Sequence, residues 1–212
     1  QPRYLHTALL LPSGSVLAIG GTSDGQAALA SLEQYDPSNG NISLITPLKT
    51  ATTPGASTPL PDGRILVMGG KLGTAYLNTT EIYAPETGMW TYGASMNTAR
   101  DEHTATLLPN GRVLVTGGRS ASAVLSSCEI YNPATRLWTF ARSMSSPRAR
   151  HTATLLADGR VLVVGGSYNL DGATRATAEI YDPRTNTWAL TASPLQPRQD
   201  HQALLLADGR VM

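Results

Sequence analysis

The sequence predicts an all-β protein composed of tandem four-stranded antiparallel units. Composition is the first indication, because the 212-residue chain is rich in Gly (20) and Pro (14) while only 15% of its residues are charged. Such a composition is typical of short strands joined by tight turns. The second indication is an internal repeat with a period near 48 residues. The third is that, within each repeat, short apolar runs alternate with turn signals.

The repeat is visible at positions that recur together along the chain. Gly-Gly pairs begin at Gly20, Gly69, Gly117 and Gly165. A Glu-x-Tyr motif follows at Glu33, Glu81, Glu129 and Glu179. Seven residues beyond each Tyr stand Ile42, Trp90, Trp138 and Trp188, and fourteen before each Gly pair stand His6, Gly55, His103 and His151. A period of this length fits a four-stranded β-propeller blade.

Each repeat predicts four strands, which we call A to D. In the fourth repeat we expect strand A over 151–156, strand B over 160–164, strand C over 178–181 and strand D around Trp188. Between strands A and B stand Asp62-Gly63, Asn110-Gly111 and Asp158-Gly159. Such pairs accept positive φ and predict two-residue hairpin turns. No α-helix is expected in residues 1–194.

The Gly-Gly, Glu-x-Tyr and Trp pattern resembles the Kelch repeat family, in the style of bacterial secreted Kelch-like and galactose-oxidase-like propeller domains. The resemblance implies a β-propeller of four-stranded antiparallel blades around a central channel. We therefore expect a single domain with complete blades over about 1–48, 49–96, 97–144 and 145–194, and a partial fifth blade over 195–212. The departures are Ile42 in place of Trp, and Thr52 and Gly55 where other repeats have Arg and His.

The two ends of the chain carry the same motif. Gln1-Pro-Arg-x-x-His6 matches Gln196-Pro-Arg-x-x-His201, so both ends supply strand A. We expect the chain to be part of a larger ring of about six or seven blades. The alternative is self-association, in which neighbouring copies complete one another through open blade edges.

The loops between strands identify the candidate ligand face. Because strands alternate in direction, the B–C and D–A loops lie at one end of a blade and the A–B and C–D turns at the other. The A–B and C–D turns repeat nearly unchanged, whereas the B–C loops vary, and variable loops on a repeated scaffold encode specificity. The candidate ligand-binding residues in these two sets of loops are Lys71, Asp101, Glu102, Arg119, Arg150, Tyr168, Asn169, Asp171 and Asp200.

Other polar residues recur with the blades and are interpreted as structural. His6, His103, His151 and His201 share one register, and Arg3, Arg100, Arg148 and Arg198 precede them by three residues. We expect these His and the strand C Glu at one end of the blades, most of them buried and hydrogen-bonded, with the Arg in a network with the Glu. The alternatives are a metal site on the His row and an anion site on the Arg row. Thr52 and Gly55 replace the Arg and the His in the second repeat. We interpret them either as sequence drift or as a gap in the ring of repeated polar side chains.

The functional prediction is a non-catalytic scaffold that binds a protein or carbohydrate ligand, without a metal or other cofactor. The alternative is the propeller domain of a sugar-active enzyme of the oxidase or isomerase type. The resemblance implies a Cys cross-linked to Tyr for copper oxidases, but Cys128 occupies a regular strand position. No basic aromatic face or long apolar run suggests nucleic-acid binding or membrane insertion. The expected location is secreted or cell-surface, with a cytoplasmic location as the alternative.

Overall fold

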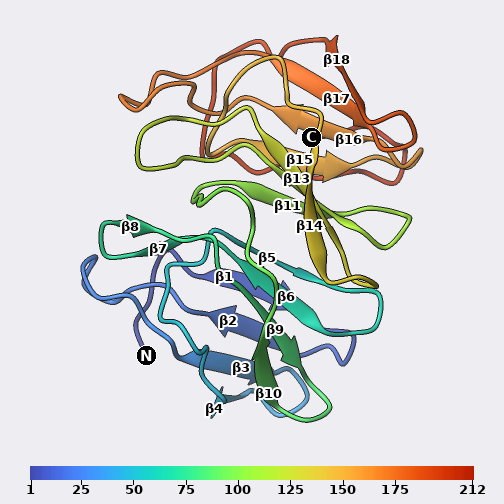
Figure 1. Ribbon diagram of the computed structural model, residues 1–212. Coiled ribbons are helices and arrows are strands. Elements are labelled where there is room, and N and C mark those ends of the chain that lie inside the picture. Colours follow the sequence, from blue (N-terminus) through green and yellow to red (C-terminus); the bar gives the residue numbers. More distant parts are fainter. The chain divides into compact units, whose positions relative to one another are not determined.

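The computed structural model describes all residues from 1 to 212, and it contains strands and turns but no helix (Figure 1). No segment therefore has the helical length and apolarity needed to cross a bilayer. The chain divides into two compact units, Gln1–Asp101 and Glu102–Met212, which are described separately. The prediction of an all-β, helix-free chain is confirmed.

The first unit contains two four-stranded antiparallel sheets, drawn from blue to green in Figure 1. The first sheet has the order β1 (Thr7–Leu10), β2 (Val16–Ile19), β3 (Leu32–Asp36) and β4 (Asn41–Ile45). The second sheet has the order β5 (Ala56–Pro59), β6 (Ile65–Met68), β9 (Thr80–Ala84) and β10 (Met89–Tyr92). A two-stranded hairpin, β7 (Lys71–Leu72) and β8 (Ala75–Tyr76), interrupts the B–C loop of the second sheet and was not expected from the sequence.

The second unit repeats this architecture. The third sheet has the order β11 (Thr104–Leu107), β12 (Val113–Thr116), β13 (Cys128–Asn132) and β14 (Leu137–Ala141). The fourth sheet has the order β15 (Thr152–Leu155), β16 (Val161–Val164), β17 (Ala178–Asp182) and β18 (Thr187–Thr191). In each sheet the strands correspond, in order, to A, B, C and D.

The pairing register is the same in all four sheets. The Glu of strand C lies opposite the middle of strand B, as in the pairs Val67↔Glu81 and Val163↔Glu179. Tyr35 lies opposite Ile42 just as Tyr83 lies opposite Trp90, so the substitution of Ile for Trp leaves the first sheet intact.

The hydrophobic core of each unit lies between consecutive sheets. In the first unit Leu17 and Ile19 of β2 and Ile65 of β6 are fully buried in one cluster with Trp90. The Trp90 indole donates a hydrogen bond to the carbonyl of Thr46 at 2.9 Å, which joins the second sheet to the end of the first. Trp188 donates in the same way to the carbonyl of Arg142 at 2.8 Å. These Trp residues therefore pack between sheets, as the repeat predicts.

The A–B turns differ from the sequence prediction. Leu60 donates a backbone hydrogen bond to the Arg64 carbonyl at 2.7 Å, and Gly63 donates to the Leu60 carbonyl at 3.0 Å. The loop is therefore three residues long, and only its last residue, Gly63, has positive φ (82°). The prediction of a two-residue turn is wrong because the Asp62 carboxylate accepts a bond from the Arg64 amide, which stabilises a type I turn followed by a left-handed Gly.

The Gly-Gly pairs bring strand B close to a neighbouring backbone. A Cβ on Gly166 would lie 2.6 Å from the Ala149 carbonyl oxygen, and one on Gly165 would lie 2.5 Å from the Arg198 carbonyl oxygen. Both glycines also have positive φ, 67° at Gly165 and 94° at Gly166. No other residue fits both requirements, so the pair determines where the B–C loop begins.

Candidate functional site

The B–C and D–A loops are joined at one end of the sheets by reciprocal backbone hydrogen bonds. Thr53 and Lys71 exchange two such bonds at 3.0 and 3.1 Å in the first unit. Ala149 and Ser167 do so at 2.9 and 2.8 Å in the second. The start of each of these B–C loops is therefore held by the D–A segment that enters the same sheet.

In the fourth sheet, a buried ion pair holds the residues on either side of the B–C loop. Arg148 donates to Glu179 at 2.6 Å, and neither side chain is more than 1% exposed. The same guanidinium donates to the carbonyls of Gly165 at 2.8 Å and Thr177 at 3.2 Å. Glu179 also accepts the Ser145 amide at 2.8 Å, so these five groups are held together. The expected Arg–Glu network is thus present, and its burial assigns it a structural role.

Three of the candidate residues form a charged row in the second unit. Arg150 donates to the Glu102 carboxylate at 2.7 Å and lies 3.8 Å from Asp200. The backbone of the row is also continuous, since Arg150 donates to the Glu102 carbonyl and Asp200 to the Arg150 carbonyl, each at 3.0 Å. The side chains are 22%, 37% and 63% exposed for Glu102, Arg150 and Asp200. The row therefore presents alternating charge to solvent.

The backbone of this row is strained. Glu102, Arg150 and Asp200 have φ of 57°, 56° and 54°, a left-handed conformation that is unfavourable for non-glycine residues. Leu5 has the same conformation at the same register, with φ of 54°. The strained backbone therefore belongs to the repeat, whereas the charges belong to particular blades. Strain of this kind persists only where surrounding structure enforces it.

The B–C loop of the fourth sheet contains three further candidates. The Arg175 guanidinium stacks over the Tyr168 ring at 4.4 Å from its centroid. The Asn169 side chain accepts the Ala173 amide at 2.8 Å and shapes the loop, while Asp171 lies on its outer turn. Arg175 was not among the predicted site residues, although its place at the end of a variable loop was a signal for it.

The remaining candidates are placed differently. Lys71 and Asp101 belong to the first unit, and the Lys71 ammonium lies 4.9 Å from the Tyr76 ring centroid. Arg119 is half-buried at the start of the B–C loop of the third sheet, where its backbone forms an antiparallel β-bridge with that of Val124. The structure therefore brings Glu102, Arg150 and Asp200 together, and Lys71 lies in a separate unit from them.

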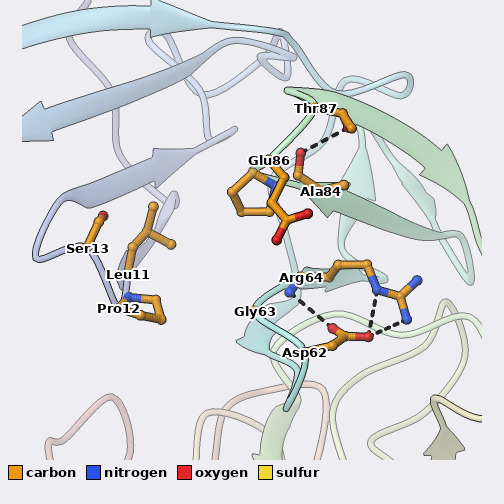
Figure 2. Close-up of a pocket in the computed structure, with 10 residues that line it drawn as sticks. Leu11, Pro12, Ser13, Asp62, Gly63, Arg64, Ala84, Glu86 and Thr87 are labelled. Carbon is orange, nitrogen blue, oxygen red and sulfur yellow. Dashed lines mark hydrogen bonds and ion pairs between the residues drawn. The ribbon is translucent and has the colours of Figure 1, made fainter.

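The opposite end of the sheets carries a cleft that the sequence reasoning did not select. In the first unit it has a volume of about 390 Å³. Figure 2 shows Leu11 and Ser13 on one side of it and Asp62, Arg64 and Glu86 on the other. The Arg64 side chain bonds Asp62 at 2.7 Å and so lowers the pKa of that carboxyl.

The second unit has a smaller cleft of about 220 Å³ at the same register, lined among others by Pro109, Asp158 and Asp182. The recurrence of the cleft with the hairpin turns indicates that it is a groove between consecutive sheets rather than a specialised site.

The His row is partly buried. His151 is buried, and its Nε2 lies 3.0 Å from Thr104 Oγ1 and 2.9 Å from Thr116 Oγ1. Burial is the main cause that lowers the His151 pKa to about 3, with smaller contributions from Arg148 and His201. His201 Nε2 lies 3.0 Å from Thr152 Oγ1. His6 is exposed in the first unit and is an exception to the burial expected for most of these His and Glu side chains. No cluster of three or more His, Cys, Asp or Glu that could hold a metal ion occurs in residues 1–212.

The Cys128 thiol is fully buried in the core of the second unit, in the same cluster as Tyr181. Burial raises the pKa of the Tyr181 phenol to about 12, and its hydroxyl donates to Asn186 at 2.9 Å. Cys128 therefore packs as a small apolar residue, as expected. At neutral pH the neighbouring Tyr is a neutral hydrogen-bond donor.

Comparisons with known proteins agree on the architecture. A family model described as the Attractin/LZTR1 beta-propeller matches residues 1–205. A search of curated proteins finds no match. Among solved structures, that of YjhT superposes with a TM-score of 0.78 at 16% sequence identity, covering 94% of this chain and 68% of the YjhT chain. At this identity the likeness to YjhT concerns the fold.

Proposed function

Because the chain belongs to the Attractin/LZTR1 family of Kelch-type β-propellers, we propose that it is a non-catalytic scaffold that binds a protein through its B–C and D–A loops. Propeller domains offer a rigid framework on which loops at one end of the blades vary. The side chains that vary most between the repeats of this chain lie in the B–C and D–A loops, and the charged row belongs to the D–A loops of the second unit.

The charged row Glu102–Arg150–Asp200 is the observation that carries the proposal. It alternates acid, base and acid on a strained backbone and is partly open to solvent. Such a row complements a partner surface with the opposite alternation, and charge complementarity supplies specificity and fast association. The Arg150 guanidinium is a suitable centre for such an interface, since Arg is enriched among residues that dominate binding energy.

A protein ligand is favoured over a carbohydrate by the surroundings of Tyr168, an exposed aromatic side chain in the B–C loop of the fourth sheet. Sugar binding commonly uses an open aromatic face, but one face of Tyr168 is already covered by Arg175 at 4.4 Å. The Arg–Tyr pair instead offers a flat, partly charged surface of the kind enriched at protein interfaces. Carbohydrate binding is the alternative that the test below distinguishes.

The test screens the purified chain against a yeast-displayed peptide library and a glycan array. Selected peptides are expected to bind, and Arg150→Gln is expected to weaken them by roughly tenfold or more. The matched control is Arg184→Gln, which removes an 83% exposed guanidinium from a C–D turn of the same sheet. Peptides whose binding is weakened by Arg184→Gln but not by Arg150→Gln would place the ligand at the end of the sheets that carries the A–B and C–D turns. Glycan binding that depends on Arg150 would identify a carbohydrate ligand instead.

A further inference from the structure

In the second sheet the buried network that supports the loops lacks its Arg, because Thr52 stands at that position. In the first and fourth sheets an Arg occupies the same pocket of acceptors. Arg3 Nη1 donates to the carbonyls of Gly20 and Ser31, both at 2.9 Å, and its Nη2 lies 3.2 Å from Glu33. Arg148 donates in the same way to the carbonyls of Gly165 and Thr177 and to the carboxylate of Glu179.

The second sheet keeps the acceptors but lacks the Arg. Its equivalent groups are the carbonyls of Gly69 and Thr79 and the carboxylate of Glu81. Gly69 donates to the Thr79 carbonyl at 2.9 Å, as Gly165 does to that of Thr177 at 3.0 Å. The strand register of Glu81 also matches that of Glu179. The three acceptors are therefore arranged as in the sheets where a guanidinium binds them.

Thr52 stands where the other sheets have Arg, and its backbone has the same hydrogen bonds. The Thr52 amide donates to Leu29 at 3.2 Å and its carbonyl accepts from Gly21 at 3.0 Å. The Arg148 amide donates to Leu125 at 3.0 Å, and its carbonyl accepts from Gly118 at 2.8 Å. The Thr52 hydroxyl reaches only the Gly69 and Lys71 carbonyls, at 3.4 and 3.3 Å. It makes no bond to Glu81.

Glu81 is consequently a buried carboxylate without a cationic partner. It is 4% exposed, and it accepts the amides of Lys49 and Thr50, each at 2.8 Å. These amides use two of about four acceptor positions and supply no charge. The Lys49 ammonium does not compensate, because it lies over the Tyr92 ring at 5.6 Å from the centroid. A buried charge of this kind is costly unless a counter-charge joins it.

We propose that the second sheet binds a guanidinium group between Glu81 and the carbonyls of Gly69 and Thr79. The planar fork of a guanidinium suits this set of two carbonyls and one carboxylate, as Arg3 and Arg148 demonstrate in the same chain. The D–A loop lies next to the carboxylate, since the amide of the exposed residue Lys49 bonds Glu81. The guanidinium is supplied either by a free guanidino compound or by an arginine of a bound peptide. This site lies in the first unit and does not depend on the proposed function.

The test measures the melting temperature of the full chain in low-millimolar guanidinium chloride, far below denaturing concentrations. We expect a saturable rise of roughly 3–6 °C at about ten times Kd. Sodium chloride at equal ionic strength should not reproduce it. A Gly-Arg-Gly peptide that gives the same rise identifies a site open to a partner's arginine, and a response to the free ion alone identifies a small-cation site. No response to guanidinium, or an equal response to sodium, overturns the proposal.

Two variants and a spectroscopic measurement sharpen the test. Thr52→Arg places a tethered guanidinium at the site, so it should raise the melting temperature and abolish the response to added guanidinium. Lys49→Arg adds a guanidinium outside the site without changing charge, and it should keep the response. The amide resonances of Lys49 and Thr50, which bond Glu81, should shift saturably during the titration of the unmodified chain. Unmoved resonances would contradict the proposal even if Thr52→Arg fails to fold.

Discussion

At the scale of single residues, the same repeat position has different chemistry in different blades. His151 is buried and accepts or donates bonds with two threonines, whereas His6 is exposed. Glu179 has an Arg partner and Glu81 has backbone amides. Repetition in the sequence therefore identifies a position, but the neighbours of that position decide its burial and its hydrogen-bond partners.

His151 should make stability depend on pH. Its pKa is about 3 in the folded chain against an ordinary value of 6.5. Below 6.5 the unfolded chain binds a proton that the folded chain excludes. The free energy of unfolding should therefore fall by about 1.4 kcal/mol per pH unit as pH drops from 6.5 towards 3. Urea unfolding at several pH values measures this slope, and His151→Gln should remove that contribution. An unchanged slope in the variant would contradict the assignment.

The buried ion pair should be sensitive to loss of one partner. Arg148→Met removes the cation beside the buried Glu179 carboxylate, while the hydrogen bond from the Ser145 amide remains. We expect a loss of about 3–5 kcal/mol in the free energy of unfolding, since an uncompensated buried charge remains. Arg160→Met is the control, because that Arg bonds an exposed Asp158 and should contribute less than about 1 kcal/mol. Chemical denaturation of both variants compares them directly, and similar losses would argue against the buried network.

At the scale of elements, the turns determine how strands follow one another. The C–D turns all place a left-handed residue at the same position, which is Gly40, Gly88, Arg136 or Asn186. Asn186 uses its side chain to accept bonds from Tyr181 and from the Arg142 amide. Gly has no steric penalty in this conformation. Arg136, with φ of 59°, therefore bears strain that its counterparts avoid or offset.

Arg136→Gly should consequently stabilise the chain by about 0.5–1 kcal/mol, because Gly removes the left-handed penalty. Thermal or urea unfolding measures the gain. Ala134→Gly in the same turn serves as control: Ala134 does not have positive φ, so Gly there should be neutral or destabilising. Equal effects of the two substitutions would show that backbone strain at Arg136 is not the cause.

At the scale of the whole molecule, burial falls from the central strands to the edge strands of the sheets. Every residue of β6 and β12 is buried, whereas β4 is exposed along nearly its whole length. Strand D also forms one edge of each sheet. Edge strands with few buried contacts open most readily.

Hydrogen exchange should follow this gradient. Amides of β6, β9, β12 and β13 should exchange more slowly than those of β4 and β18, because their opening requires disruption of the core. Mass-spectrometric exchange of the intact chain provides the comparison. Uniform protection across each sheet would indicate that the blades open only as whole units.

Much of the fold could be predicted because its determinants are local. Alternation of apolar residues, the Gly-Gly pairs and the turn residues act over a few positions, and they specified the strands and their order. The prediction for the A–B turn was wrong because an Asp-Gly pair is compatible with both a two-residue and a three-residue loop. The hydrogen bond from the Arg64 amide to the Asp62 carboxylate decides between them, and the pair alone does not reveal it. The site residues and the secreted or cell-surface location stay predictions.

The sequence by itself determined the blade architecture, the order of the four strands in each repeat, and the end of each sheet where the variable loops lie. Only the tertiary structure decided which of those loops act together. Glu102, Arg150 and Asp200 stand about one repeat apart, and their contacts arise where consecutive sheets meet. The missing guanidinium at Glu81 likewise became visible only by comparison with the filled sites around Arg3 and Arg148. Such contacts depend on how one sheet packs on the next, and local patterns do not encode that packing.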